Sequence, residues 1–483
     1  MDRNKIKERL ELALRPAEKP TLEEVLEQVS TRGVLRGPVD WVFPAWMLYV
    51  DYVVQKIAET FQLSEEERGQ LLHFRDTMKQ LLLKAWMQTK EKLTTLYKAV
   101  AEGTYRMEGN KLYAPDGTWM YMRGGFAPHI TIHGVNARCY FPDMLKLPQE
   151  KLELLQLGWR ASDEGNEKSR PFMSTTQPWQ VFAWTAARHG ELYIRIDTVF
   201  LTREGVSVSV HITARSWRQR WSKDEAIDLV RNHFERGEWA PLLATWLGDG
   251  NARWKEVLRG KYVLTIVAKE PWRLSTKTSK YVALVATGRE AFVKLKESVG
   301  VYGELLDLLS AHKWVVVKLA TDDGFRAAYK LKIEKKRSID VLRETYRRNN
   351  GEAPTEQLPE TERQRGDAVI VAGVVMYLEL VSGRGGSLYA RRRIKNLGYA
   401  LAIAERLESA GLKPNVVKTD ARYMVYITTA DLLKLAERDE AVRRAVALYL
   451  AEKVKNGTPR QKELAEKILK RNPLFSTNAF LLP

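Results

Sequence analysis

Apolar side chains recur at helical spacing through the first hundred residues. Runs over 22–29, 46–61 and 64–101 each place apolar positions on one side of an expected helix. Ser64 is followed by three glutamates, a pattern typical of a helix start because the hydroxyl and the third carboxylate satisfy free backbone amides. We therefore predict a helical N-terminal module over residues 1–102.

Between residues 103 and 221 the apolar positions alternate with polar ones, which indicates short strands. We predict strands over 111–114, 119–123, 130–133, 192–200 and 206–213. The last two flank a glycine-containing turn near 203–205, which predicts a hairpin. This part of the chain is expected to be a β-rich region.

From residue 222 onward helices and strands alternate in a repeated order. We predict helices over 222–235 and 239–247, strands over 261–269 and 280–286, helices over 289–298 and 303–311, strands over 314–320 and 325–334, and a helix over 338–348. A similar order follows, with strands over 369–381 and 387–394, a helix over 397–410, strands over 415–418 and 423–428, and a helix over 430–437. The repeat predicts two like halves, 222–348 and 367–440.

The two predicted halves are separated by residues 349–366, which are polar, contain prolines and are expected to form a linker. A basic helical tail is expected over 441–483. The predicted fold class is α+β, with a helical N-terminal module, a β-rich middle region and a C-terminal αββαββα double repeat.

The segment 238–251 combines an apolar helix with an abrupt acidic end. Leu243, Trp246 and Leu247 recur at helical spacing, and Gly248-Asp249-Gly250 follows directly. The two glycines lack Cβ atoms, so another backbone can approach the helix end closely. Asp249 is therefore the first candidate for a catalytic or metal-binding carboxylate, although a glycine-flanked aspartate is also common in ordinary helix-to-loop turns.

This segment resembles the LAGLIDADG motif of homing endonucleases, and the resemblance extends over residues 222–440. It implies that two motif helices pack through small residues and place one acidic residue each at the base of a DNA-binding saddle. By this resemblance Asp249 is a metal ligand, and Mg²⁺ is the cofactor if the protein cleaves DNA.

A second motif is expected just before the strand at 369, but Asp367 and Glu362 there lack a preceding apolar helix. Two interpretations remain: a homodimer brings two Asp249 residues together, or catalysis has been lost and DNA binding retained.

The formal charge of +18, from 78 Lys and Arg against 60 Asp and Glu, makes a polyanion the first partner to consider. Surface ion-pair networks of a heat-stable protein are the alternative explanation, but they would nearly balance acids and bases. We therefore expect nucleic acid, duplex DNA first, as the partner. The candidate nucleic-acid-binding residues are Arg215, Arg218 and Arg220, interleaved with Trp217 and Trp221, and Lys261, Lys269, Arg273, Lys277, Lys280, Lys318, Lys330, Arg391, Arg392 and Arg393.

The second half also resembles the PaRep family of paralogous repeat proteins of hyperthermophilic crenarchaea. The resemblance lies in residues 405–417, 423–437 and 456–460. It implies an archaeal, thermophilic protein but carries no established activity.

Cys139 is the single cysteine, which excludes an internal disulfide framework and a thiolate zinc cluster. The N-terminus has no signal-peptide pattern and the most apolar segment, 39–54, contains charged residues, so we expect a cytoplasmic protein that does not span a membrane. Two further functions stay open: a non-catalytic regulatory DNA-binding protein, and an RNA- or ribosome-associated binding protein.

Overall fold

The computed structural model describes residues 3–122, 128–251, 253–267, 277–279, 282–335, 339–340, 342–343, 346, 367–381, 387–419 and 422–475. The chain forms two compact units, Met1–Lys330 and Leu331–Pro483. Each unit has its own apolar core. The protein is therefore an α+β protein of two units, and the finer division into six segments stays a prediction.

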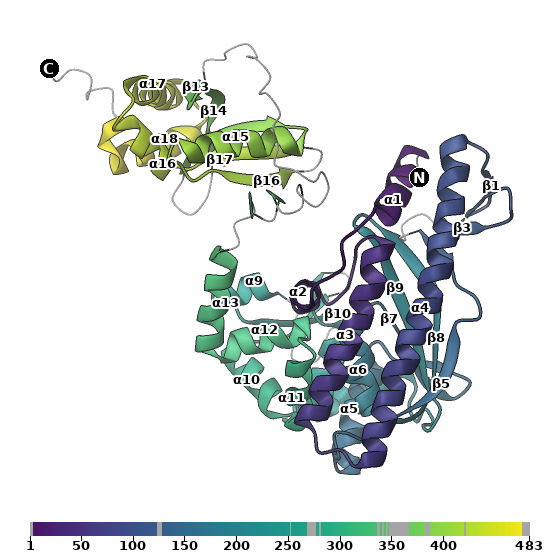
Figure 1. Cartoon of the computed structure of the whole chain (residues 1–483). Helices are drawn as coiled ribbons and strands as arrows, with labels where there is room; N and C mark the ends of the chain where they lie inside the picture. The colour runs from purple at the N-terminus through teal and green to yellow at the C-terminus, as the bar shows by residue number, and fades with distance from the viewer. Residues whose placement is uncertain are drawn as a thin grey trace. The chain divides into compact units, whose positions relative to one another are not determined.

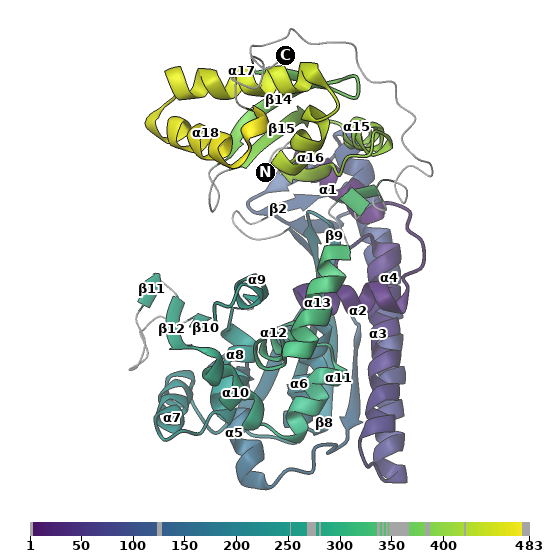
Figure 2. The same cartoon turned by 90° about the vertical axis from the view of Figure 1, so that its left-hand side faces the viewer.

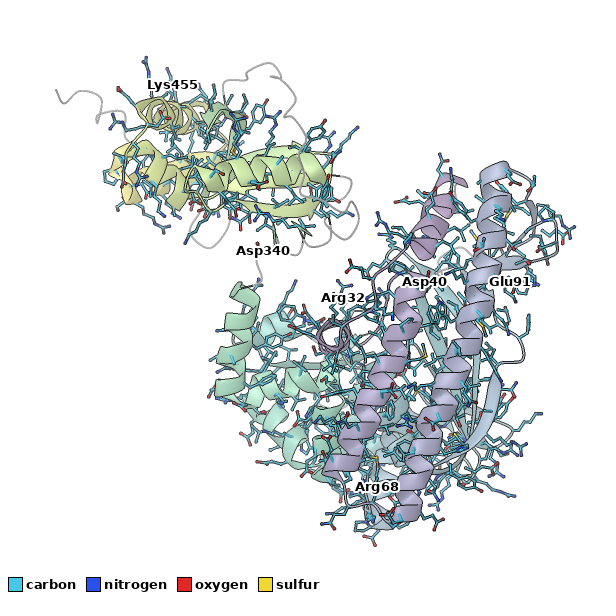
Figure 3. The ribbon with its side chains drawn as sticks, in the orientation of Figure 1. Arg32, Asp40, Arg68, Glu91, Asp340 and Lys455 are labelled. Carbon is cyan, nitrogen blue, oxygen red and sulfur yellow. The ribbon has the colours of Figure 1, made fainter. Side chains whose placement is uncertain are left out.

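Unit 1 opens with α1 (Arg3–Leu14), which was not predicted as a separate helix. Helices follow at the three predicted positions, α2 (Leu22–Arg32), α3 (Val39–Thr60) and α4 (Glu65–Glu102), although α3 begins seven residues earlier than expected. Ser64 caps α4 as predicted, since its hydroxyl accepts from the amide of Glu67 and the Glu67 carboxylate accepts from the amide of Ser64. Helices α3 and α4 lie side by side (Figure 1) and are joined by the ion pair of Lys90 with Asp40, whose Nζ and Oδ2 are 2.9 Å apart. Arg68 and Glu91 mark the two halves of α4 in Figure 3.

A nine-stranded antiparallel sheet follows, in the order β1-β2-β3-β4-β8-β9-β7-β6, with β5 also paired to β8. Its strands are β1 (Arg106–Glu108), β2 (Lys111–Tyr113), β3 (Trp119–Tyr121), β4 (His129–Thr131), β5 (Asn136–Phe141), β6 (Gly165–Glu167), β7 (Arg170–Thr175), β8 (Gly190–Thr202) and β9 (Gly205–Ala214). All five strands predicted for this region and the β8–β9 hairpin are confirmed.

Three helices are interleaved with these strands: α5 (Gln149–Ala161), α6 (Pro178–Ala187) and α7 (Lys223–Glu235). The order α5-β6-β7-α6-β8-β9-α7 is one helix, two strands, one helix, two strands and one helix. Its strands are arranged β6-β7-β9-β8 within the larger sheet. The αββαββα order expected at 222–348 thus occurs at residues 149–235 instead.

The rest of unit 1 contains α8 (Ala240–Asp249), α9 (Trp254–Leu258), β10 (Val263–Val267), β11 (Lys277–Ser279), β12 (Val282–Thr287), α10 (Arg289–Glu297), α11 (Val301–Leu308), α12 (His312–Thr321) and α13 (Asp323–Lys335). The three strands form a separate sheet in the order β10-β12-β11. Figure 2 shows this region with α7, α8 and α10 close together.

The strands predicted at 314–320 and 325–334 are wrong, because these residues form α12 and α13. The valines at 315–317 suggested a strand, but all three are buried in the core of unit 1. A short, continuous apolar run has no period that separates a buried strand from a buried helix, so tertiary packing decided the conformation.

Unit 2 contains β13 (Ala368–Val371), β14 (Val374–Val381), β15 (Ser387–Ile394), α15 (Leu397–Ser409), β16 (Asn415–Thr419), β17 (Arg422–Ile427), α16 (Thr429–Ala436), α17 (Glu440–Asn456), α18 (Pro459–Arg471) and a final short turn of 3-10 helix, Pro473–Phe475. Its antiparallel sheet has the order β13-β14-β15-β17-β16. The single strand expected at 369–381 is a hairpin, because Ala372 and Gly373 adopt positive φ angles of 48° and 74° and reverse the chain.

Candidate active site at the ends of two packed helices

Helices α5 and α8 pack with their backbones unusually close. A Cβ atom on Gly158 of α5 would lie 2.6 Å from the Cβ of Ala244 and nearer still to the carbonyl oxygen of Pro241. A Cβ atom on Gly248 would lie 2.5 Å from the Cβ of Ser162. Glycine at these two positions is what permits the approach, and it brings the C-terminal ends of both helices together.

Two carboxylates meet at these helix ends. Asp249 is the last residue of α8, and Asp163 follows the end of α5. Burial and, next, the negative charge of Asp163 raise the pKa of Asp249 to about 6, while Lys223 and Lys313 act in the opposite direction. Asp163 is exposed and Asp249 is partly exposed, so the pair is reachable from solvent.

Lys313, in the first turn of α12, is buried directly behind this pair. Its Nζ donates to the carbonyl oxygens of Leu247 at 2.8 Å and Trp246 at 3.3 Å, and also to that of Gly248. These carbonyls belong to the last turn of α8, where the helix dipole favours a cation. Burial lowers the pKa of Lys313 to about 8, although Asp163 and Asp249 partly oppose that shift.

Gln180 of α6 holds Asp163 in place. Its Nε2 donates to Oδ2 of Asp163 at 2.9 Å and makes a longer contact, 3.5 Å, with the carbonyl oxygen of Leu247. Its Oε1 accepts from the Thr175 hydroxyl at 2.5 Å. Because both ends of the buried amide are bonded, the side chain is fixed between α5 and α8.

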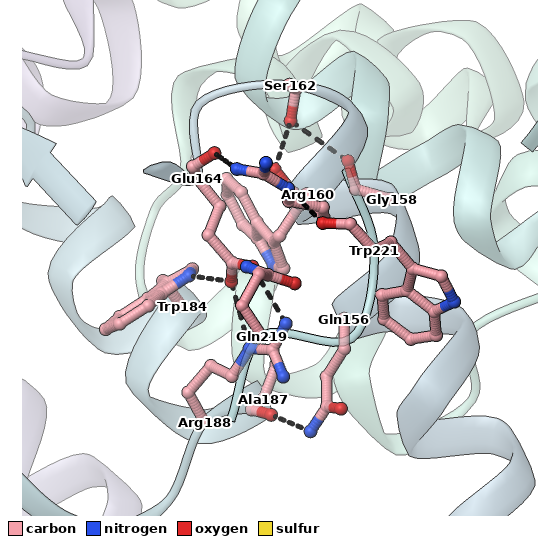
Figure 4. Close-up of polar contacts among 11 residues, drawn as sticks. Gln156, Gly158, Arg160, Ser162, Glu164, Trp184, Ala187, Arg188, Gln219 and Trp221 are labelled. Atoms are coloured by element: carbon pink, nitrogen blue, oxygen red, sulfur yellow. Dashed lines mark hydrogen bonds and ion pairs between the residues drawn. The ribbon is translucent and has the colours of Figure 1, made fainter. Parts of the chain in front are cut away.

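A buried ion pair anchors the residue next to Asp163 (Figure 4). The Glu164 carboxylate accepts two bonds from Arg188, at 2.9 and 2.8 Å, and both side chains are almost fully excluded from solvent. Trp184 Nε1 donates to the same carboxylate at 2.8 Å and Gln219 Nε2 at 2.7 Å. Four charge-assisted bonds offset the desolvation of Glu164 and fix the turn from which Asp163 projects.

The structure thus brings Asp249 and its flanking glycines into one cluster with Asp163, Gln180 and Lys313, which the sequence analysis missed. Asp163, upstream of Asp249 in the same unit, is the carboxylate whose charge acts on Asp249. Asp367 belongs to unit 2, and Glu362 lies outside the described residues, so the second motif expected there stays a prediction. A sequence signal for Asp163 existed, because a small residue lies five positions before each aspartate, Gly158 before Asp163 and Ala244 before Asp249. The homodimer considered from the sequence stays a prediction.

The predicted basic residues that the structure describes lie on several elements of both units. Lys261 and Lys330 are exposed, Lys277 belongs to β11, and Lys318 of α12 pairs with Asp307, whose Oδ1 is 2.8 Å from its Nζ. Lys269, Arg273 and Lys280 lie outside the described residues. Arg391, Arg392 and Arg393 belong to β15 of unit 2.

The segment that interleaves arginines with tryptophans is anchored to the fold. Trp217 and Trp221 pack against the core of unit 1, and Trp217 Nε1 donates to the carbonyl of His189 at 2.7 Å. Arg215 and Arg220 form ion pairs with Glu191 and Glu153, while Arg218 is exposed. Both tryptophans are therefore partly buried packing residues.

Within the described parts of the chain, no group of three or more His, Cys, Asp or Glu side chains is arranged to hold a metal ion. In the same residues, every helix is too short or too polar to cross a bilayer. Comparison of the chain with known protein families, with curated proteins and with solved structures finds no match.

Proposed function

We propose that the protein binds duplex DNA and hydrolyses its phosphodiester bonds at the paired carboxylates Asp163 and Asp249, with Mg²⁺ as cofactor. The observation that carries the proposal is the close approach of two helix ends, each with one aspartate, beside a buried lysine. The formal charge of +18 supports a polyanionic substrate.

The donor set fits one hydrated Mg²⁺ ion. Mg²⁺ is commonly held through one or two carboxylates and keeps several waters, so it does not require a three-residue cage. The raised pKa of Asp249 marks a carboxylate that lacks full charge compensation in the protein alone. A divalent cation between Asp163 and Asp249 would supply that compensation and, when bound, polarise a phosphate oxygen and activate a water molecule.

The chain's own residues have distinct roles in this proposal. Asp163 and Asp249 hold the cation, and Gln180 positions Asp163 through its 2.9 Å bond. Lys313 contributes positive charge beside the developing negative charge of the transition state, where a fixed cation in a water-poor site is most effective. Glu164 and Arg188 act indirectly, because their ion pair fixes the turn that carries Asp163.

The resemblance to LAGLIDADG homing endonucleases supports the same proposal, but with different residues assigned to the two halves. We infer that α5 and α8 correspond to the two motif helices, so the proposed halves begin near residues 149 and 240 rather than 222 and 367. The first would contain the β6-β7-β9-β8 arrangement, and the second would retain only the sheet β10-β12-β11.

A plasmid-nicking assay with Mg²⁺ tests the proposal. We expect Asp249→Asn and Asp163→Asn each to lower the nicking rate by roughly 100-fold or more, as loss of one preorganised electrostatic group typically does. Asp228→Asn, an exposed acid on α7, is the matched control and should nick like the parent. A parent rate that survives in both active-site variants would remove this pair from the mechanism.

A non-catalytic DNA-binding protein is the alternative, and one observation favours it. Lys313 already lies where its positive charge partly compensates both aspartates, so the cluster is partly neutralised without a metal ion. In that case the parent binds duplex DNA with a steep salt dependence but does not nick it in Mg²⁺ or Mn²⁺. Competition between duplex DNA and structured RNA at matched salt separates this function from an RNA- or ribosome-associated one.

A further inference from the structure

Among the described residues of unit 2, the apolar core packs against one face of the five-stranded sheet. Leu378, Ala390 and Val425 pack into that core. The residues that alternate with them point to the opposite side, because successive side chains of a strand face opposite directions. We call this side the open face; its central residues are Tyr377, Tyr389, Arg391, Arg393, Met424 and Tyr426.

Tyrosine rings cover the middle of the open face. Tyr377, Arg391 and Tyr426 are direct cross-strand neighbours on β14, β15 and β17. The rings of Tyr389 and Tyr426 stack with their centroids 4.8 Å apart and an interplanar angle of 20°. All three tyrosines are partly exposed. At the edge, Ile370 of β13 is 52% exposed.

The charges on this face are mainly positive. Arg391 and Arg393 lie two residues apart on β15 and Arg422 begins β17, and Arg393 and Arg422 are exposed. Arg391 lies across the sheet, with its Nη1 3.9 Å from the sulfur of Met424, and it pairs with Glu379. Glu379 is the one acidic side chain among the described residues of the face.

We propose that the open face binds single-stranded nucleic acid, with bases stacked on Tyr389, Tyr426 and Tyr377 and phosphates bound by Arg393 and Arg422. Exposed aromatic rings flanked by arginines suit this ligand, because every base has a π-face and every nucleotide carries a negative charge. A duplex is a poorer fit, since its bases are already stacked on one another. An acidic protein partner would use the arginines but would leave the planar rings without matching groups.

This surface is separate from the proposed nuclease site, which lies in unit 1. It does not depend on Asp163, Asp249 or Mg²⁺. Loss of nicking and loss of single-strand binding are therefore independent results.

The test is fluorescence anisotropy of the full chain with a labelled 20-nucleotide oligo(dT), with a duplex of equal length for comparison. Stacking of a base on an aromatic side chain contributes about 1–3 kcal/mol, so we expect Tyr389→Leu with Tyr426→Leu to weaken oligo(dT) binding at least roughly tenfold. Tyr389→Phe with Tyr426→Phe keeps both rings and should bind within about twofold of the parent. Tyr399→Leu, on α15, is the control for a lost tyrosine elsewhere in unit 2.

Arginine variants provide a second, matched comparison. Arg393→Ala should weaken binding and reduce its salt dependence, whereas Arg392→Ala, on the core side of the same strand, should not. The proposal is overturned if the double leucine variant binds oligo(dT) like the parent, or if Tyr399→Leu weakens binding equally. It is also overturned if the double leucine variant converts an oligomeric parent to a monomer without affecting oligo(dT) binding, because the face would then be an interface between copies.

Discussion

Asp249 is the residue whose chemistry is most sensitive to its surroundings. Its carboxyl is held at a pKa of about 6 by burial and by Asp163, against an ordinary value of 3.8. In the metal-free protein this raised pKa contributes stability below pH 3.8 that is lost as the pH rises through 6. The metal-free protein favours the protonated Asp249 carboxyl. Binding of a cation favours the deprotonated carboxylate instead, because a carboxyl group must lose its proton to bind a metal ion.

We therefore expect the affinity for Mg²⁺ to fall as the pH drops below about 6, by roughly tenfold at pH 5, because one proton competes with the metal. Isothermal titration calorimetry in two buffers of different ionisation enthalpy measures both the affinity and the released proton. Asp249→Asn should bind weakly at every pH and release no proton at this site. A parent affinity that is constant from pH 5 to 7 would contradict the assignment of Asp249 as a ligand.

At the scale of elements, the contact between α5 and α8 determines the geometry of the site. Gly158→Ala places a methyl group against Ala244 and the Pro241 carbonyl, so the helices must separate. We expect a loss of about 1–3 kcal/mol in the free energy of unfolding, measured in urea. Separation also weakens the repulsion from Asp163, so the pKa of Asp249 should move toward its ordinary value, which NMR titration detects.

Gly69→Ala is the control for the helix substitution. Gly69 lies in α4 with open space where the Cβ would be added, so alanine should stabilise the protein by about 0.5–1 kcal/mol. If Gly158→Ala and Gly69→Ala changed the free energy of unfolding equally, glycine at position 158 would not be required for the close approach of α5 and α8.

The buried ion pair of Glu164 and Arg188 also affects the arrangement of the elements, because it fixes the turn that carries Asp163. Glu164→Gln leaves the Arg188 guanidinium buried without a counter-ion, and we expect it to cost roughly 3–5 kcal/mol by chemical denaturation. Glu164→Gln combined with Arg188→Met should cost less than the sum of the two single changes. Lys467→Ala, which removes an exposed ion pair with Glu463, should leave the denaturation midpoint close to that of the parent.

At the scale of the whole molecule, the two units have separate apolar cores. We expect calorimetry to show two unfolding transitions. Ile403→Ala truncates a buried side chain of unit 2 and should destabilise one transition by about 2–5 kcal/mol while leaving the other in place. Leu243→Ala, in the core of unit 1, should affect the other transition. A single transition shifted by both substitutions would show that the units unfold together.

The amino-acid sequence by itself determined part of the local structure of this protein. Periodic apolar positions and capping residues are local signals, so α2, α3, α4, the β8–β9 hairpin and all but the last two residues of α8 were predicted. The period of two of a strand places Arg391 and Arg393 on one face of β15 and Arg392 on the other.

Only the tertiary structure decided which residues meet. Asp163 and Asp249 are far apart in the chain, and their pairing depends on how α5 packs against α8. Lys313 directly precedes the valine-rich segment for which the sequence predicted a strand. It reaches the site because tertiary packing makes this part of the chain the helix α12. Local sequence patterns fix backbone preferences over a few residues, whereas a site built from four segments depends on contacts that no local pattern encodes.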